Sequence, residues 1–153
     1  MVLYMIDVTG FFACLMALKR DGRPMETLAD MAGLVRVRPG MALVLTALSF
    51  SFLGLPPFSG FWGKFFVFRA ALNAGLWPEA VAGLVLSVVA AFYYLRLVKV
   101  MWFDAPAGEV DASPRETKAV AYAAALFSFP VVIVALGALD SVAMTAAAAL
   151  SIH

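Results

Sequence analysis

The sequence has little charge and very few residues that bind metals or form disulfides. Only 14% of its 153 residues are charged, the formal net charge is +1, and it contains one cysteine and one histidine. Zinc, haem and iron–sulfur sites need several Cys or His ligands at set spacings, so we expect none of them in this chain. A disulfide framework needs paired cysteines. The near-zero net charge also argues against nucleic acid as a partner.

The hydrophobic content, in contrast, is high. Apolar residues make up 64% of the chain and the mean hydropathy is +0.95, whereas soluble domains are roughly 45–50% apolar. Charges are almost absent from four stretches: 1–18, 40–63, 80–95 and 119–139. Each reaches, with its flanks, the length of about 20 apolar residues that a helix needs to cross a bilayer. Because backbone groups in lipid must bond to one another, we predict an all-α, polytopic transmembrane protein with about four spans.

The second apolar region, 40–75, is interrupted by the run Gly-Leu-Pro-Pro-Phe-Ser-Gly at residues 54–60. Two consecutive prolines remove backbone donors and clash with the preceding turn, so a regular helix cannot continue through them. The region could form two crossings, a re-entrant hairpin, or one crossing made of two half-helices. In each case the residues that break the helix are Gly54, Pro56, Pro57 and Gly60.

The basic residues favour a single broken crossing. Most of them lie in two stretches: Lys19, Arg20, Arg23, Arg36 and Arg38, then Arg96, Lys99, Arg115 and Lys118. Cytoplasmic loops are enriched in Lys and Arg, and only a single crossing of 40–75 puts both stretches on that side. We therefore predict one membrane-embedded unit, residues 1–153, with both termini non-cytoplasmic. Its spans are about 1–18, 40–75 (broken at 54–60), 77–101 and 118–139, and its cytoplasmic loops are 19–39 and 102–117.

Lys64 is the one basic residue expected deep in a span. If the second half-helix covers 60–74, Lys64 lies ten residues before its outer end, or ~15 Å at 1.5 Å per residue, about half the hydrocarbon thickness. Burial disfavours the charged form of an amine, so a lysine at this depth can change protonation near neutral pH, as a proton relay requires. The alternative is a lysine permanently paired with a carboxylate elsewhere.

Three more residues are candidates for a water path: Asp7, Ser87 and Tyr94. Ser87 and Tyr94 belong, with Gly83 and Ala90, to a stripe of small or polar residues on the third span. Such a stripe suits close helix packing, which is the favoured interpretation. Asp7 is an acid within the first span, where a charge costs ~2.5–3.5 kcal/mol at a helix centre. It can be a relay residue, a protonated bystander, or a sign that this span sits differently.

Three segments carry a family resemblance. They are SFSFLGLPPFSGFWGKFFVF at 49–68, YYLRLVKVMWFD at 93–104, and the loop containing KRDGR at 19–23 and DMAGL at 30–34. In collinear order they resemble the last four spans of subunit N of the NADH–quinone oxidoreductase, respiratory complex I, an antiporter-like membrane subunit. Other antiporter-like relatives share the broken helix but usually differ around the Pro-Pro and Gly-Lys-Phe positions.

The resemblance implies a proton-translocating subunit, or its C-terminal fragment, in which Lys64 transfers protons coupled to quinone reduction. It also implies a multi-pass protein of the bacterial inner membrane. Its partners would be the lipid bilayer, other complex I membrane subunits and the N-terminal spans of its own subunit. NADH, FMN, iron–sulfur clusters and quinone would be bound by partner subunits, with no redox chemistry here and no activity of the chain alone. The alternatives are a monovalent cation/proton antiporter subunit, a non-catalytic assembly module, or an inactive fragment of an interrupted gene.

Overall fold

A computed structural model of the chain describes residues 2–56 and 58–128. Pro57 and the predicted fourth span beyond Ser128 lie outside the described residues. The helical fold class is confirmed, because helices account for most of the described chain. In chain order the elements are α1 (Val2–Ala17), β1 (Lys19–Arg20), β2 (Arg23–Pro24), η1 (Ala29–Met31), α2 (Leu34–Val37), α3 (Pro39–Leu53), α4 (Ser59–Asn73), α5 (Trp77–Phe103) and α6 (Arg115–Ser128).

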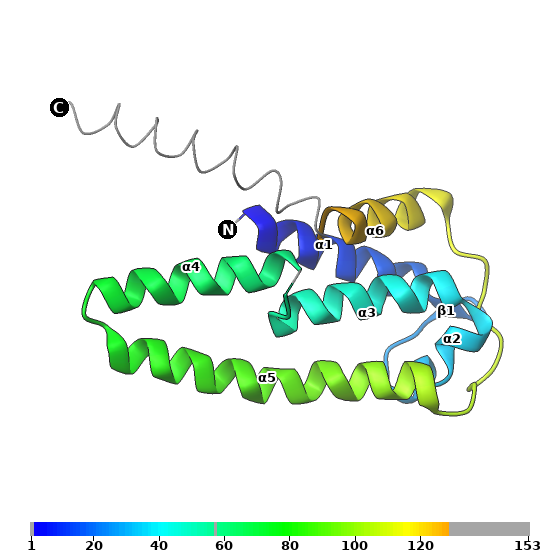
Figure 1. Cartoon of the computed structure of the whole chain (residues 1–153). Coiled ribbons are helices and arrows are strands. Elements are labelled where there is room, and N and C mark those ends of the chain that lie inside the picture. Colours follow the sequence, from blue (N-terminus) through cyan, green and yellow to red (C-terminus); the bar gives the residue numbers. More distant parts are fainter. Residues whose placement is uncertain (1, 57, 129–153) are drawn as a thin grey trace.

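Two half-helices together match one long helix. α5 has 27 residues, about 40 Å at 1.5 Å per residue, and is the one described helix that is by itself long and apolar enough to cross a membrane. α3 and α4 have 15 residues each and follow one another end to end. Figure 1 shows both packed along α5, which runs back in the opposite direction. The region 40–75 therefore contains two helices, and the interruption is shorter than the predicted 54–60, because Ser59 and Gly60 already belong to α4.

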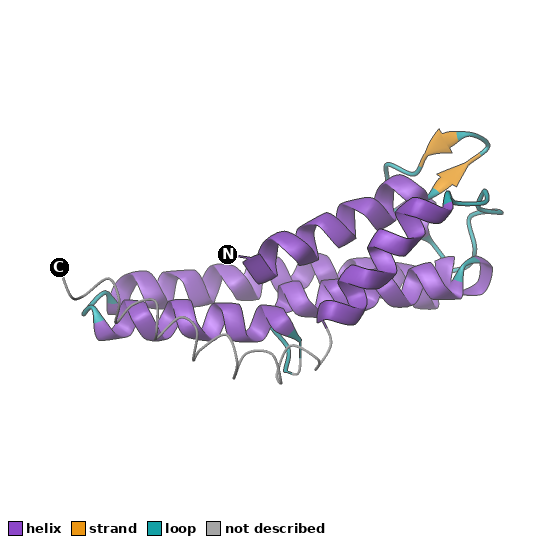
Figure 2. Cartoon of the chain, turned by 90° about the horizontal axis from the view of Figure 1, so that it is seen from above, coloured by secondary structure: helices purple, strands orange, loops and turns teal. Residues whose placement is uncertain are grey.

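The connection between α1 and α3 contains an element that the all-α prediction did not include. β1 and β2 form a two-stranded antiparallel hairpin with Lys19 opposite Pro24 (Figure 2). Its turn residues Asp21 and Gly22 have φ of 51° and 74°, the left-handed values that a type I′ turn requires. The Asp-Gly dipeptide between two short segments is the local signal for this hairpin.

The two basic segments lie at the same end of the helices and bond to each other. The Asp111 N–H donates to the Lys19 carbonyl (2.8 Å), and the Arg38 guanidinium donates to the Val110 carbonyl (3.0 Å). The Ala107 N–H donates to the Ala32 carbonyl (3.2 Å). The chain leaves this end through α3 and α4 and returns to it through α5 (Figure 1).

The packed core lies at the same end as these loops. Side chains from α1, α3 and α5 meet there, and Leu18, Leu34, Leu45, Leu48 and Met101 are fully buried. The α4–α5 hairpin extends beyond this core and exposes large apolar side chains, among them Val67, Leu84, Leu86 and Val88. Apolar exposure on this scale is typical of a surface that contacts lipid or other protein helices.

Candidate functional site at the helix break

Gly54 ends α3 in a way that leaves two backbone carbonyls without a partner from the helix. With φ at 85°, it adopts the left-handed conformation that favours glycine. The Leu55 N–H donates to the Phe50 carbonyl (3.1 Å) and the Gly54 N–H to the Ser51 carbonyl (2.9 Å), the two bonds of a Schellman motif. This motif satisfies the carbonyls of residues 50 and 51. The carbonyls of Phe52 and Leu53, also in the last turn, need partners from elsewhere.

Lys64 supplies those partners. Its Nζ donates to the Phe52 carbonyl (2.8 Å) and to the Leu53 carbonyl (3.2 Å), so a side chain of α4 caps the end of α3. The C-terminal end of a helix carries partial negative charge, which stabilises a cation there. Lys64 makes no ion pair with any residue in the described ranges 2–56 and 58–128. The side chain thus points back toward the break instead of outward along α4.

The start of α4 is fixed by contacts with the end of α3. The Gly60 N–H donates to the Ser51 hydroxyl (2.9 Å), which caps one of the free amides at this helix start. A Cβ at Gly60 would overlap the Ser51 carbonyl oxygen, so the close approach of the two half-helices requires glycine at this position. The break predicted at Gly54 and Gly60 therefore has a physical reason at each residue.

Asp7, on α1, lies against the same break and is only 1% exposed. Its Oδ2 accepts hydrogen bonds from the Ser51 hydroxyl (2.6 Å) and the Ser59 hydroxyl (2.8 Å). Ser59 is also 3.1 Å from the Ser128 hydroxyl of α6, so this buried polar network joins α1, α3, α4 and α6. The three serines were not predicted as site residues. Their signal in the sequence is that Ser51 and Ser59 flank the break on its two sides.

Asp7 and Lys64 line one cavity of about 260 Å³, which is large enough for several water molecules. Tyr4, Phe52, Gly63 and Phe68 are among its other lining residues. The structure thus brings together two of the predicted site residues from separate helices.

Ser87 and Tyr94 do not line this cavity. The Ser87 hydroxyl donates to the Gly83 carbonyl of its own helix (2.9 Å), and the Tyr94 ring lies 5.3 Å from that of Phe52. Both residues are half-buried, as are Gly83, Ala90 and Ala91, in a stretch of α5 whose other side chains are mostly exposed. Within the stripe, Gly83 lies against Phe68 of α4 and Tyr94 against Phe52 of α3, contacts that suit close packing. A part for Ser87 or Tyr94 in a water path stays a prediction.

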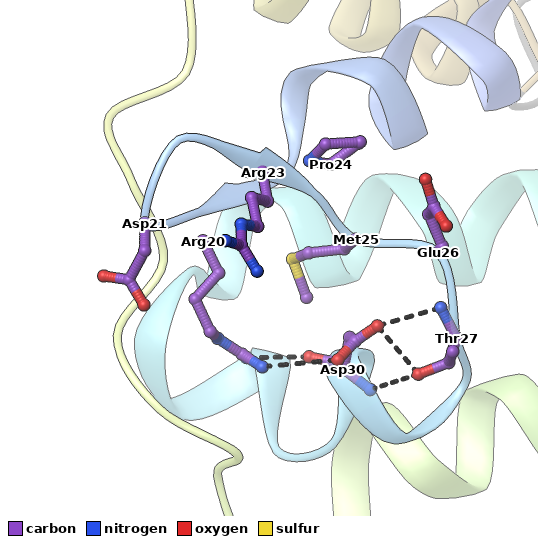
Figure 3. A pocket seen from close by; sticks show the side chains of 8 residues that line it. All are labelled: Arg20, Asp21, Arg23, Pro24, Met25, Glu26, Thr27 and Asp30. Carbon is purple, nitrogen blue, oxygen red and sulfur yellow. Dashed lines mark hydrogen bonds and ion pairs between the residues drawn. The ribbon is translucent and has the colours of Figure 1, made fainter.

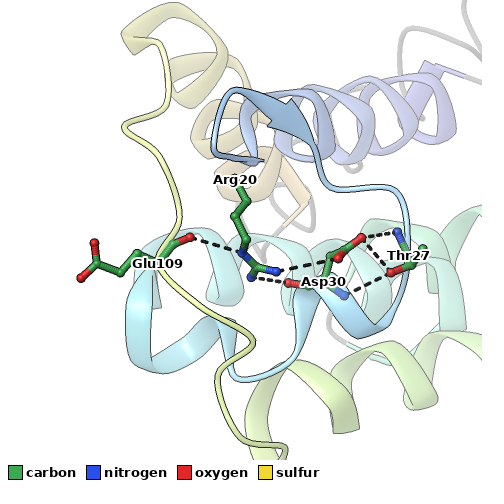
Figure 4. Close-up of polar contacts among 4 residues, drawn as sticks. All are labelled: Arg20, Thr27, Asp30 and Glu109. Atoms are coloured by element: carbon green, nitrogen blue, oxygen red, sulfur yellow. Dashed lines mark hydrogen bonds and ion pairs between the residues drawn. The ribbon is translucent and has the colours of Figure 1, made fainter.

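A second hollow, of about 690 Å³, lies among the loops and is lined by Arg20, Asp21, Arg23, Pro24, Met25, Glu26, Thr27 and Asp30 (Figure 3). Three of its polar residues, Arg20, Thr27 and Asp30, are joined by hydrogen bonds and an ion pair. Arg20 donates to the carbonyls of Asp30 (2.8 Å) and Glu109 (3.3 Å), so it ties the two loops together (Figure 4). The Thr27 hydroxyl, its backbone N–H and, more weakly, the Arg20 charge hold the pKa of Asp30 below its usual value. This arrangement is structural.

The described residues contain no group of three His, Cys, Asp or Glu side chains that could hold a metal ion. Cys14 is buried in the core. The groups that the described residues bring to the break are an amine, a carboxyl and hydroxyls beside a cavity large enough for several water molecules.

A helix interrupted at glycines, with a lysine bonded across the interruption, agrees with the resemblance to antiporter-like membrane subunits. The family model described as "NADH:quinone oxidoreductase/Mrp antiporter, TM" matches residues 1–90, and the chain belongs to this family. Its similar relatives are NADH-quinone oxidoreductase subunits N. The one from Caulobacter sp. (strain K31) is 67% identical over 97% of this chain and 32% of its own length. Subunit N 1 of Acidiphilium cryptum (strain JF-5) is 45% identical over 84% of this chain and 27% of its own.

Among solved structures, a chain of respiratory complex I from Thermus thermophilus with bound aureothin has a similar fold. The TM-score is 0.68 at 34% identity, over 82% of this chain and 30% of that one. The chain thus spans about a third of the length of the relatives it matches. The resemblance of three segments to subunit N is confirmed over nearly the whole sequence.

Proposed function

We propose that this chain forms part of a proton-translocating subunit N of a bacterial NADH–quinone oxidoreductase and that Lys64 transfers protons there. The observation that carries the proposal is the position of the Lys64 amine, held by the Phe52 and Leu53 carbonyls beside a cavity and without a counter-ion among the described residues. The subunit N relatives favour this function over a cation/proton antiporter or an assembly module.

The hydrogen bonds of Lys64 suit both of its protonation states. An ammonium has three N–H donors, and two of them are used on the carbonyls. The third can leave as the transferred proton, and the neutral amine keeps two N–H bonds for the same carbonyls. Proton release therefore leaves no backbone acceptor of the break unpaired, which would otherwise cost ~1–3 kcal/mol per buried group.

The remaining functions of the complex are assigned to other parts of it. We propose that NADH, FMN, iron–sulfur clusters and quinone bind to partner subunits, and that the chain contacts other complex I membrane subunits and the N-terminal spans of its own subunit. The exposed apolar side chains of α4 and α5 supply surface for such contacts and for lipid. Expressed alone, the chain is expected to be inactive in proton transport, which proton uptake by vesicles containing only this chain would measure.

The proposed orientation places both basic loops in the cytoplasm and both termini outside. The mutual hydrogen bonds of the loops support a common side, and the basic residues support the cytoplasm. Single cysteines at Ala107 and Asn73, both exposed, test this in a Cys14-free background. A membrane-impermeant reagent added to intact cells should label position 73 and spare position 107. Labelling of position 107 from outside would contradict the proposed orientation.

The test of the function uses the complete complex reconstituted in lipid vesicles, with proton uptake measured per NADH oxidised. Lys64→Gln can still donate to both carbonyls but carries no transferable proton, so uptake should fall at least about tenfold with assembly intact. Lys64→Arg should not restore it, because a guanidinium does not release its proton. Arg69→Ala is the matched control, since Arg69 is an exposed basic residue of the same helix. Uptake at the wild-type level in assembled Lys64→Gln would refute the proposal.

A further inference from the structure

The two oxygens of Asp7 have different surroundings. Oδ2 accepts hydrogen bonds from the hydroxyls of Ser51 and Ser59, while Oδ1 is buried and has no partner among the described residues. Buried polar atoms without a partner are rare and costly in folded proteins. The residue also lines the cavity that Lys64 lines. A proton on Oδ1, or water in the cavity bonded to Oδ1, would satisfy this atom.

The hydroxyl protons of Ser51 and Ser59 are both used in hydrogen bonds to Asp7. Each hydroxyl has one proton to donate. If the hydroxyls of Ser51 and Ser59 point at Oδ2, neither can donate to the other, and the Ser128 hydroxyl must be the donor in its 3.1 Å contact with Ser59. The Ser51 oxygen accepts from the Gly60 N–H. The two hydroxyl protons that reach Asp7, those of Ser51 and Ser59, are both oriented toward Oδ2, so Oδ1 is the oxygen left for a further proton.

The helix break stabilises opposite charges at its two ends. Asp7 contacts Ser59, the first residue of α4, and the N-terminal end of a helix favours an anion. Lys64 contacts the last carbonyls of α3, where a cation is favoured. Asp7 and Lys64 do not form an ion pair with each other. Water in the shared cavity favours the charged pair, and its loss favours the neutral pair.

We propose that Asp7 is a second proton-exchanging residue, which passes protons to and from Lys64 through their shared cavity. The inference rests on the proposed function of Lys64. In the transfer, an N–H bond of the Lys64 ammonium breaks, an O–H bond forms at Asp7 Oδ1, and cavity water carries the proton between them. The products are a neutral amine and a neutral carboxylic acid, so net charge is unchanged and no electrons move.

The test compares Asp7→Asn, Asp7→Glu and the double variant with Lys64→Gln in the reconstituted complete complex. Asn keeps an acceptor for the serine hydroxyls but cannot be protonated, so proton uptake per NADH should fall at least about tenfold, and Asp7→Glu should recover part of it. If both residues act on one path, adding Asp7→Asn to Lys64→Gln should cause no further loss. Thr9→Val is the control, because Thr9 lies on the same helix, is exposed and bonds only to its own Met5 carbonyl.

A second readout separates proton exchange from a structural role. Infrared difference spectra between acid and alkaline pH should show a carboxyl band that is absent in Asp7→Asn and whose titration midpoint moves in Lys64→Gln. The other ionisable groups lining the cavity are Tyr4 of α1 and Lys64 of α4; α3 contributes Ser51 and α6 places Ser128 in the network.

The outcomes are distinguishable. Wild-type uptake by Lys64→Gln would overturn the proposed function itself. Loss of uptake in Lys64→Gln with wild-type uptake in assembled Asp7→Asn would overturn only the role of Asp7. If the Asp7→Asn complex fails to assemble, Asp7→Glu assigns the infrared band by shifting its frequency. An unmoved midpoint of that band in Lys64→Gln would also overturn the role of Asp7.

Discussion

The helix break and the loop end of the molecule both bring charged side chains to backbone carbonyls, but they treat the charges differently. At the loop end Lys99 pairs with Asp104 (2.9 Å) and Arg20 lies 3.8 Å from Asp30, in contacts that are partly open to solvent. At the break Asp7 and Lys64 each bond to neutral groups and not to each other. Exposed ion pairs contribute little to stability. Charges held apart on neutral partners can instead gain or lose a proton, which is what a transfer site needs.

The largest expected effect on stability comes from adding a side chain at Gly60, where the two half-helices are in close contact. Gly60→Ala places a Cβ where the Ser51 carbonyl oxygen lies, so the two half-helices must move apart. We expect ~1–3 kcal/mol of destabilisation, the range for overpacked sites. Gly63→Ala is the control, because a Cβ there meets nothing within 4 Å, and it should be neutral or stabilising by ~0.5–1 kcal/mol. Thermal unfolding of the complete complex measures both, and equal stability would contradict the packing argument.

Two glycines with positive φ, Gly54 and Gly75, allow the effect of backbone strain to be distinguished from the effect of disturbing Lys64. Gly54→Ala and Gly75→Ala both place alanine at positive φ (85° and 77°), at ~1–2 kcal/mol each. Only at Gly54 does the new Cβ press on Lys64, 3.1 Å from its Cδ. Both variants should lose similar stability, while proton uptake per NADH should fall in Gly54→Ala alone. An equal fall in both would assign the effect to strain.

At the loop end, Arg20→Ala should loosen the contact between the two loops. Its guanidinium donates to two carbonyls, and hydrogen bonds from charged groups contribute ~1.5–3 kcal/mol each, less where solvent competes. We expect faster proteolysis within 102–114 than in wild type. Arg23→Ala is the control, since that side chain makes no hydrogen bond or ion pair to any residue of the described chain. Cleavage at the same rate in both variants would show that the Arg20 contacts do not hold the loops.

The smallest effect concerns pH. The Thr27 hydroxyl, together with its N–H and Arg20, lowers the pKa of Asp30 relative to the unfolded chain. A lowered folded pKa means that its stabilisation is complete above the unfolded value of about 3.9 and is lost as pH falls through the folded pKa. The stability difference between wild type and Asp30→Asn should therefore be constant at neutral pH and shrink in acid. Denaturation curves across that range measure it, and a difference that grows in acid would contradict the assignment.

The parts of the site that could be predicted from the sequence are those with local signals. Proline pairs, glycines and a lone lysine in an apolar run mark a break and a buried amine without knowledge of packing, so Gly54, Gly60 and Lys64 were identified. The partners of Asp7 could not be found in this way. Ser51, Ser59 and Ser128 come from three helices and meet only through tertiary contacts. The Asp21-Gly22 hairpin has a local signal in its Asp-Gly pair, but it is only four paired residues long, and the apolar spans on either side determine the predicted fold class.

The contacts across the break also have a mechanical consequence. The Ser51 side chain of α3 accepts a hydrogen bond from the first turn of α4, and the Lys64 side chain of α4 donates to the last turn of α3. Each half-helix is therefore bonded to a side chain of the other. A tilt of one half-helix against the other has to stretch both of these hydrogen bonds at once. The two half-helices are therefore expected to move together, so that a displacement of α4 also displaces the end of α3 and the helices packed on it.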